Sequence, residues 1–363
     1  MTSLSDMRKA ERAEFLSRSG WGAATAKPLA GDASTRSYER LEMGAKRALL
    51  MNAPPKAETA ACPPEASPDE RRRLGYNALA RLAGPNLNAF LAVADALRRG
   101  GLSAPEIYAA DPQRGFAVIE DLGDDLYVRA IPAGADEETL YAAAIDALLL
   151  LREAAPAPPK TPQYTMLSYD RTALETEAAL LSEWYWPHVK GEAPSPSLLA
   201  DYAAAWAPAL DRLAPPSTVL LRDYHAENLL WLPRRKGAAR VGVIDFQDGL
   251  VGAPAYDLVS LLEDARRDVA PALAEKMIAR YCSGAAAIGP FDEAAFRRDY
   301  AILAAQRNAK ILGIFARLVS RDKKPRYLEF LPRVEGMFRR DLESEALQPL
   351  RRFFAAHFPE LAP

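Results

Sequence analysis

Two short apolar runs in the sequence each lead into acidic residues that could bind a metal ion or a hydroxyl group. Thr218 to Leu221 precedes Asp223, which Asn228 follows five positions later, and Val241 to Ile244 precedes Asp245. If these runs form strands that pair, the polar side chains cluster and offer the hard oxygen ligands that suit Mg²⁺. One carboxylate is then left to orient a hydroxyl nucleophile. The alternative is two ordinary turns rich in Asp and Asn, but the presence of both segments favours the cluster.

The same segments resemble the catalytic loop and the metal-binding turn of kinase-like phosphotransferases. Asp223-x-x-x-x-Asn228 and Ile244-Asp245-Phe246 are closest to the aminoglycoside/choline phosphotransferase branch, and Ala255 to Leu258 resembles a third element of that branch. Longer stretches are similar to the bacterial N-acetylmuramate/N-acetylglucosamine anomeric kinases of cell-wall recycling; they include LAGDASTRSYERLE, VIEDLGDDL, LRDYHAENLLWLP and QRNAKILGIFARL. This resemblance implies ATP-dependent phosphorylation of the amino sugar at C1, with Mg²⁺ as cofactor. The product would be an α-1-phosphate that feeds UDP-sugar synthesis.

The resemblance also implies roles for single residues. Asp223 would accept or orient the proton of the attacking hydroxyl, and Asn228 and Asp245 would hold Mg²⁺. Asp257 is expected to support the catalytic loop from a helix N-terminus. The nucleotide would contact a hairpin over its phosphates and a hinge between two lobes; the residues expected there are Gly31, Asp32, Ala33, Ser34, Glu120 and Leu122.

Two positions depart from the family pattern. Leu221 stands where a histidine precedes the catalytic aspartate by two positions, and Met51 occupies the expected position of the lysine that contacts the donor phosphates. We expect Arg36, Lys46 or Arg47 to make that contact instead, or metal and backbone groups to hold the donor. Backbone amides of the hairpin can bind an anion as well.

Candidate contacts for the sugar come from helical segments and from the catalytic loop; the residues are Glu183, Trp186, His188, His225 and Arg307. Aromatic faces beside a carboxylate suit a sugar ring, which predicts a platform at the first three. Arg307 and Arg266 could bind an acyl or lactyl group, because Arg pairs with a carboxylate through two hydrogen bonds. Each candidate has a competing interpretation. The aromatic segment with Trp186 could be a helix end packed in the core, the arginines could lie on a solvated helix face, and His225 could only hold the conformation of its loop.

The surrounding sequence predicts a small sheet followed by a mainly helical region. A helix is expected at 4–19, and short apolar runs between turn residues predict antiparallel strands within 26–52 and at 116–119. Apolar residues at helical spacing predict later helices at 86–99, 136–154, 172–186, 197–213, 255–265, 270–283, 292–319 and 337–357. We therefore predict an α+β, two-lobed, protein-kinase-like fold. Its N-terminal nucleotide-binding lobe would span 1–120, and its helical lobe for catalysis and substrate binding would span 121–363.

Composition argues against several other classes of protein. The 363 residues include 46 Lys and Arg against 48 Asp and Glu, so a global basic field for nucleic acid is absent. No apolar run is long enough to span a membrane, charges interrupt the start of the chain where a secretory signal would be apolar, and two distant cysteines form no disulfide framework. We expect a cytoplasmic enzyme whose partners are an amino sugar and ATP, with no nucleic acid and no membrane.

Two other functions stay open at this point. One is a kinase for another small hydroxylated or aminated molecule, such as choline or an aminoglycoside, although segment 160–200 is only modestly acidic for a polycationic acceptor. The other is a non-catalytic nucleotide-binding regulator, which Leu221 and the missing lysine would suit. The intact Asp223, Asn228 and Asp245 argue against a regulator, and consumption of ATP in the presence of sugar separates the two.

Overall fold

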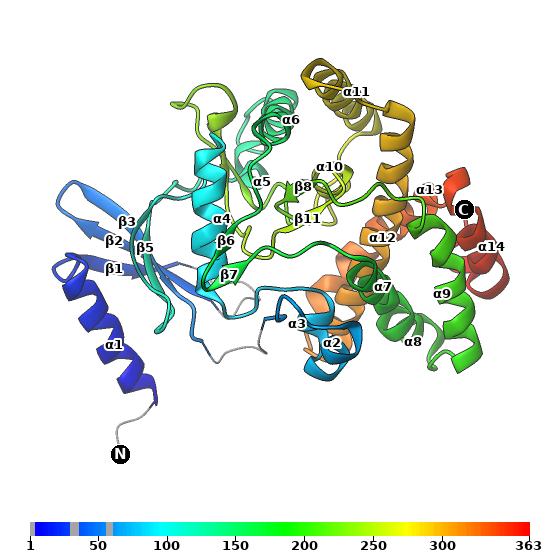
Figure 1. Cartoon of the computed structure of the whole chain (residues 1–363), viewed down its shortest axis with the longest axis horizontal. Helices are drawn as coiled ribbons and strands as arrows, with labels where there is room; N and C mark the ends of the chain where they lie inside the picture. The colour runs from blue at the N-terminus through cyan, green and yellow to red at the C-terminus, as the bar shows by residue number, and fades with distance from the viewer. Residues whose placement is uncertain (1–3, 30–35, 56–60) are drawn as a thin grey trace.

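The computed structural model describes residues 4–29, 36–55 and 61–363 of this chain (Figure 1). An antiparallel sheet occupies one end of the elongated molecule, and helices make up most of the rest. The five strands lie in the order β1-β2-β3-β5-β4; they are β1 (Thr25–Pro28), β2 (Ser37–Met43), β3 (Lys46–Asn52), β4 (Ile107–Asp111) and β5 (Phe116–Ile119). This architecture confirms the predicted α+β, two-lobed, kinase-like fold.

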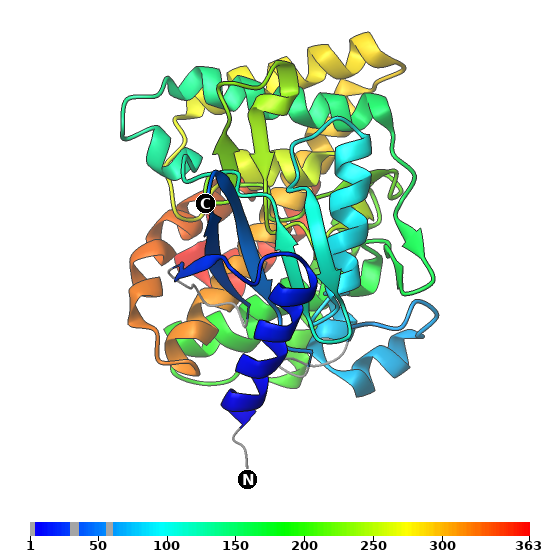
Figure 2. The ribbon, with the colours of Figure 1, turned by 90° about the vertical axis from the view of Figure 1, so that its left-hand side faces the viewer.

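The sheet lies between two helices because its strands turn alternate side chains to opposite faces. On β3, Leu50 joins a small cluster with Phe15, whereas its neighbour Met51 joins the main core of the molecule. Helix α1 (Leu4–Arg18) supplies Phe15 and covers the outer face. Helix α4 (Leu87–Arg99) lies between the sheet and the helical part (Figure 1), and α1 lies in front of the strands in the view from the sheet end (Figure 2).

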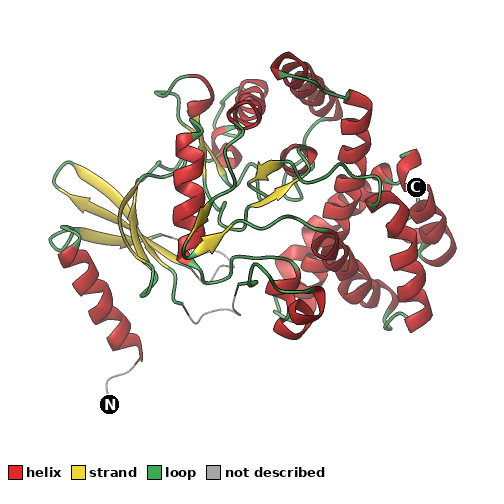
Figure 3. Cartoon of the chain, in the orientation of Figure 1, coloured by secondary structure: helices red, strands yellow, loops and turns green. Residues whose placement is uncertain are grey.

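The remainder of the chain is mostly helical, with short two-stranded ladders between the helices (Figure 3). The helices are α2 (Pro68–Leu74), α3 (Tyr76–Leu79), α5 (Tyr127–Ala130), α6 (Glu137–Ala154), α7 (Arg171–Leu180), α8 (Trp186–Lys190), α9 (Pro196–Leu210), α10 (Ala255–Leu262), α11 (Pro271–Ile288), α12 (Glu293–Ser320), α13 (Leu331–Asp341) and α14 (Gln348–His357). The short strands are β6 (Lys160–Thr161), β7 (Tyr164–Thr165), β8 (Thr218–Leu220), β9 (Leu229–Trp231), β10 (Val241–Val243) and β11 (Leu250–Gly252). Single turns of other helix types lie at Leu181–Tyr185, Gly237–Arg240, Pro325–Phe330, Glu345–Leu347 and Pro359–Leu361.

Two predicted helices end differently from the sequence-based expectation. The segment 337–357 is not one helix but the end of α13, a 3₁₀ turn and α14. Ser344 caps the turn with its hydroxyl, and Pro349 has no amide hydrogen for a continuous helix, so the chain restarts there. The helix expected at 172–186 passes instead into a π-helical turn at Leu181–Tyr185.

The division between the lobes at residue 120 stays a prediction. The sheet strands all precede that residue, but α2 and α3 pack toward α7 in the helical part. Arg71 of α2 is buried there and forms an ion pair with Asp170, with 2.6 Å between Nη1 and Oδ2. Within the described ranges, no helix is both long enough and apolar enough to cross a membrane.

Helix α12 is the longest of the molecule and packs against α7, α10 and α13. Its closest approach to the end of α7 is at Gly313, where a Cβ atom would overlap with the backbone carbonyl group of Leu180. A side chain at this position would therefore force the two helices apart.

We predict that Gly313→Ala destabilises the protein. The added methyl group meets backbone, which cannot move aside as a flexible side chain would, so we expect a loss of about 2 kcal/mol or more in the free energy of unfolding. Gly336→Ala in α13 is the matched control, because its nearest neighbour would be the end of the Arg340 side chain at 3.8 Å. The control should be neutral or gain up to about 1 kcal/mol from helix propensity. Equal melting temperatures for the two variants would contradict the close approach.

Candidate active site

The two acidic loops meet, although the strands before them do not pair with each other. The two runs form strands, but each pairs with another partner: β8 pairs with β11, and β10 pairs with β9. The Ile244 amide donates to the Asn228 carbonyl over 3.1 Å, which extends the β9–β10 ladder to the two loops. Asp223 and Asp245 therefore line one cavity without a direct β8–β10 pair.

The cavity has a volume of roughly 180 Å³ and contains six of the residues that the sequence singled out for the site: Asp223, His225, Asn228, Asp245, Arg266 and Arg307. Its lining is Asp223, His225, Glu227, Asn228, Asp245, Ala265, Arg266, Arg307, Lys310, Ile311, Ile314 and Phe315. Acidic and amide groups come from the two loops, whereas α12 contributes cationic and apolar groups. The stripe on α12 at positions 307, 310, 311, 314 and 315 has the spacing of a single helix face.

Asp257 holds the catalytic loop by accepting two backbone hydrogen bonds. The amides of Leu221 and Arg222 donate to its carboxylate over 2.7 and 2.8 Å. Arg222 has a φ of 71°, an uncommon value for a residue with a side chain, so the loop needs such support. Burial raises the pKa of Asp257 to about 7, and the two amide bonds work against that rise. The predicted supporting position of Asp257, at the start of α10, matches this geometry.

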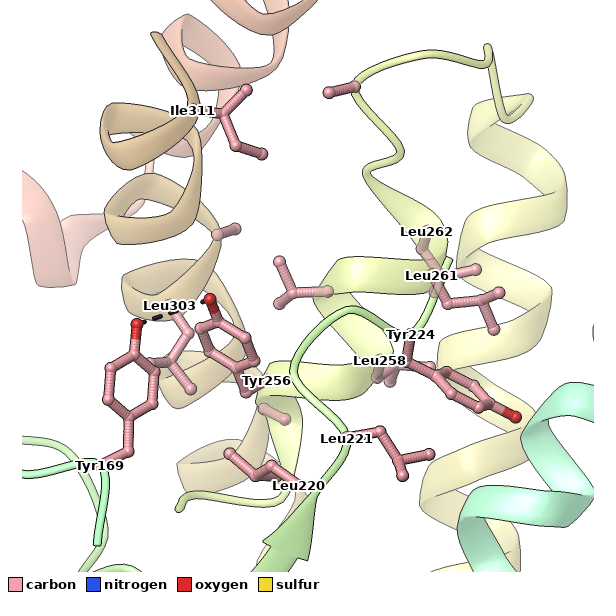
Figure 4. Close-up of a cluster of buried hydrophobic side chains, with 14 of the residues drawn as sticks. Tyr169, Leu220, Leu221, Tyr224, Tyr256, Leu258, Leu261, Leu262, Leu303 and Ile311 are labelled. Carbon is pink, nitrogen blue, oxygen red and sulfur yellow. Dashed lines mark hydrogen bonds between the residues drawn. The ribbon is translucent and has the colours of Figure 1, made fainter. Parts of the chain in front are cut away.

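Leu221 departs from the family pattern because its position is part of the core. Its side chain is buried in an apolar cluster around the loop, together with Leu258 and Leu261 (Figure 4). On the other side of the loop, the rings of Tyr169 and Tyr256 meet edge to face, with centroids 5.1 Å apart. A leucine therefore anchors the loop here by packing.

A buried ionic cluster that the sequence did not point to lies behind the loop. Glu177 of α7 is fully buried and forms ion pairs with Arg222 of the loop and with Lys310 of α12, the latter at 3.1 Å. The hydroxyl of Tyr169 donates to the same carboxylate. The cluster ties three distant segments together, and it puts the Lys310 ammonium close to the cavity.

The two carboxylates of the cavity have opposite pKa shifts. Burial acts to raise the pKa of Asp223, but the Lys310 ammonium and the surrounding His225 and arginine groups outweigh it, so the pKa lies below its usual value. Desolvation, with the charge of Asp223, raises the pKa of Asp245 to about 6. The Asp245 side chain is still 48% exposed, so a ligand can reach it. Asp223 is therefore ionised at neutral pH, and Asp245 is the carboxylate that gains most from a nearby cation.

Asn228 and Asp245 fit a hard divalent cation. The Asn228 amide nitrogen donates to the Asp223 carbonyl over 2.9 Å, which leaves its side-chain oxygen to act as a ligand. The Asn228 oxygen and the Asp245 carboxylate, with Asp223 in the same cavity, are oxygen donors of the kind that a hard divalent cation prefers. Across the described ranges, no three His, Cys, Asp or Glu side chains converge on one point, so donor phosphates or water would complete the shell.

His225 is buried in the cavity wall, and burial lowers its pKa, so the ring is neutral at pH 7. Its Nε2 lies 3.4 Å from the amide nitrogen of Asn228. Its Nδ1 is buried and has no hydrogen-bond partner within the described parts of the chain. The ring thus braces the loop from the cavity wall.

On the nucleotide side, Arg36 is the basic residue that reaches the site. Its guanidinium lies 3.6 Å from the Asp245 carboxylate and also donates to the Gly84 carbonyl. Lys46 and Arg47 lie at the start of β3 with exposed side chains, and Met51 is fully buried in the core. The predicted phosphate-covering residues Gly31, Asp32, Ala33 and Ser34 lie outside the described residues.

The expected hinge follows β5. The Glu120 amide donates to the Glu106 carbonyl over 2.8 Å, and the Glu120 side chain forms an ion pair with Arg235. Glu120 can therefore offer a nucleotide its carbonyl group, but not its amide or its carboxylate. Leu122 lies two residues further on and is half-buried.

The predicted sugar platform is not brought to the cavity. Trp186 is buried against Phe358 near the C-terminus, with ring centroids 4.9 Å apart, and Glu183 and His188 are exposed beside it. This is the packed helix end that the sequence left as the alternative. The aromatic ring at the cavity belongs to Phe315 of α12.

Comparisons with known proteins agree with this geometry. The profile of a family described as "Phosphotransferase enzyme family" matches residues 25–297. The chain is 48% identical over 98% of its length, and 98% of the relative's, to an N-acetylmuramate/N-acetylglucosamine kinase of Caulobacter vibrioides. A protein of the same name from Pseudomonas putida is 32% identical over 86% of this chain and 83% of its own length.

Solved structures support the same fold. A choline/ethanolamine kinase family protein from Mesorhizobium loti matches with a TM-score of 0.55 at 16% identity and covers 96% of this chain and 99% of its own. A microcompartment-associated aminopropanol kinase matches with a TM-score of 0.54 at 15% identity and covers 94% and 99%. The range matched by the family profile includes both acidic loops, with Asp223, Asn228 and Asp245. This chain therefore belongs to the phosphotransferase enzyme family and, within it, to the N-acetylmuramate/N-acetylglucosamine kinases.

Proposed function

We propose that this enzyme uses ATP to phosphorylate N-acetylmuramate and N-acetylglucosamine at the anomeric C1 hydroxyl, giving the sugar α-1-phosphate for cell-wall recycling. The observation that carries the proposal is the cavity in which an ionised Asp223 lies beside Asp245 and Asn228. Relatives that carry the name of this activity extend over nearly the whole chain, which supports the same chemistry here. The two distant cysteines are both free and buried, in keeping with a cytoplasmic enzyme.

Asp223 is proposed as the catalytic carboxylate. Its lowered pKa keeps it ionised at neutral pH, so it can accept a hydrogen bond from the attacking hydroxyl and orient its lone pair. Asp257 holds the backbone just before Asp223, and the charge of Lys310 favours the ionised form of Asp223, so the group is preorganised before the acceptor binds.

Asn228 and Asp245 are proposed to hold Mg²⁺ through their side-chain oxygens. When bound, Mg²⁺ supplies positive charge that offsets the charge of the donor phosphates. We further propose that Arg36 takes the place of the lysine that Met51 replaces, and that the backbone at Glu120 and Leu122 receives the adenine. Gly31, Asp32, Ala33 and Ser34 would cover the phosphates, with residues 1–120 as the nucleotide-binding lobe and 121–363 as the catalytic one.

The α12 side of the cavity argues against a cationic acceptor such as choline or an aminoglycoside. Arg307 lines that side, forms no ion pair within the described parts of the chain, and would repel a quaternary ammonium or a polyamine placed against it. A neutral or anionic sugar meets no such repulsion. Asp223, Asn228 and Asp245 share the cavity, which argues against a non-catalytic regulator.

We predict that Asp223→Asn lowers kcat by at least about 100-fold while ATP binding persists, because the amide cannot accept the proton or carry the charge. Steady-state kinetics and calorimetric ATP titration measure the two effects. Asp201→Asn, on the exposed side of α9, is the control and should match the wild type. A variant that keeps more than about a tenth of the wild-type kcat would contradict the role of Asp223.

We predict that Asp245→Ala abolishes most activity and weakens the Mg²⁺-dependent part of nucleotide affinity. The substitution removes a charged ligand from a cation that accepts few substitutes. Calorimetric ATP titrations with and without Mg²⁺ separate this effect from a general loss of binding. If Mg²⁺ strengthens ATP binding equally in the variant and the wild type, Asp245 is not a metal ligand.

The third prediction concerns the position of phosphorylation. The anomeric hydroxyl is the most acidic hydroxyl of a sugar, so a single carboxylate can serve it without a strong base. We expect reducing 2-acetamido sugars to be substrates and their methyl glycosides, which are blocked at C1, to be inert. ³¹P NMR should find an acid-labile, non-reducing product with phosphate on C1. Rapid turnover of a methyl glycoside, or phosphate on C6, would refute the anomeric assignment.

A further inference from the structure

The cavity is divided by charge, and its cationic side has one arginine that forms no ion pair with a described residue, although Asp223 and Glu263 lie within range of its charge. Lys310 is paired with Glu177 at 3.1 Å, and Arg266 is paired with Glu227 at 3.1 Å. Arg307 also lines the cavity, but no ion pair within the described parts of the chain includes it. Its side chain is nevertheless buried, with only 5% of the residue exposed.

Arg307 is held so that part of its guanidinium is free. Nη1 donates to the backbone carbonyl of Glu263 over 3.1 Å, which fixes the direction of the side chain without neutralising its charge. The Glu263 carboxyl accepts instead from the Asn308 amide over 2.7 Å, and burial raises its pKa. A buried arginine in this state favours an anion from outside the chain, because buried charges are normally paired.

The surroundings of Arg307 suit a sugar that carries a carboxylate. Ile311, Ile314 and Phe315 lie on the same face of α12 and form an apolar wall for a pyranose ring and an acetamido methyl group. The side chain of Arg266 is 26% exposed, and its guanidinium is a second cationic group in the same cavity. Planar guanidinium groups bind carboxylates through paired hydrogen bonds.

We propose that Arg307, assisted by Arg266, binds the carboxylate of an acidic acceptor and so determines the preference of the enzyme for N-acetylmuramate over N-acetylglucosamine. This inference rests on the proposed function. The two sugars differ by a lactyl ether on O3, whose carboxylate is the only charged group of either molecule. The other anion that could reach Arg307 is a donor phosphate, and the experiment distinguishes the two.

The experiment compares kcat/KM for both sugars at saturating ATP in the wild type, Arg307→Gln, Arg307→Lys and Arg266→Gln. Hydrogen bonds to a charged group correspond to roughly a 10–100-fold change in binding. We therefore expect Arg307→Gln to lower the ratio of kcat/KM for N-acetylmuramate to that for N-acetylglucosamine by about 10–100-fold, through the KM of the acidic sugar. Arg307→Lys should lose less, because it keeps the charge. Arg297→Gln, on the exposed start of α12, is the matched control and should leave the ratio unchanged.

A parallel measurement needs no variant of Arg307, and it decides the question if Arg307→Gln does not fold. The wild type is given N-acetylmuramate and its lactyl carboxamide, which has the same shape without the charge; the carboxamide should be about as poor a substrate as N-acetylglucosamine. Equal use of acid and amide would overturn the proposal. The proposal would also be overturned if Arg307→Gln lowered kcat/KM equally for both sugars and raised the KM for ATP. That result would assign Arg307 to the donor phosphates. If the wild type phosphorylates neither sugar, the proposed function itself fails, a result distinct from an unchanged ratio.

Discussion

The pairing of one buried carboxylate with two cations is the interaction on which the active site depends. Glu177 has no access to water, and it can exist as an anion there only because Arg222 and Lys310 meet it from other segments. Removing such charges from water costs several kcal/mol each, so an incomplete cluster would be strongly unfavourable. Helix α7, the catalytic loop and α12 must therefore come together as a set, and the loop can adopt its left-handed backbone at Arg222 only within that set.

The same cluster gives the two aspartates of the cavity different properties. Lys310, held by Glu177, keeps Asp223 ionised, whereas Asp245 lies further along, where desolvation and the Asp223 charge disfavour its anion. Two identical side chains thus become suited to different tasks, one to orient a hydroxyl and one to receive a cation. Asp257 fixes the position of Asp223, because the two hydrogen bonds that it accepts hold the backbone just before that residue.

Local sequence patterns predicted the elements of this fold well and their connections less well. The short apolar runs on β3 and β5 and the helical spacing in α4, α6 and α12 predicted the observed elements. The sequence placed the two acidic loops together on the condition that β8 and β10 pair, but β8 pairs with β11 and β10 with β9, because strand partners are set by the whole chain. The aromatic segment at Trp186 has the composition of a sugar site, but packing against Phe358 buries its ring away from the cavity.

The sequence by itself determined which polar groups the two loops carry, because Asp223, Asn228 and Asp245, the residues proposed for catalysis and metal binding, lie within a few residues of a strand end. It could not reveal Glu177, Lys310 or Phe315, since each lies on a helix whose pattern looks like that of an ordinary core helix. Only the tertiary structure decided which face of α12 meets the loops. The physical reason is that periodicity specifies which residues share a face, whereas the partner of that face follows from packing and from charges that must be neutralised together.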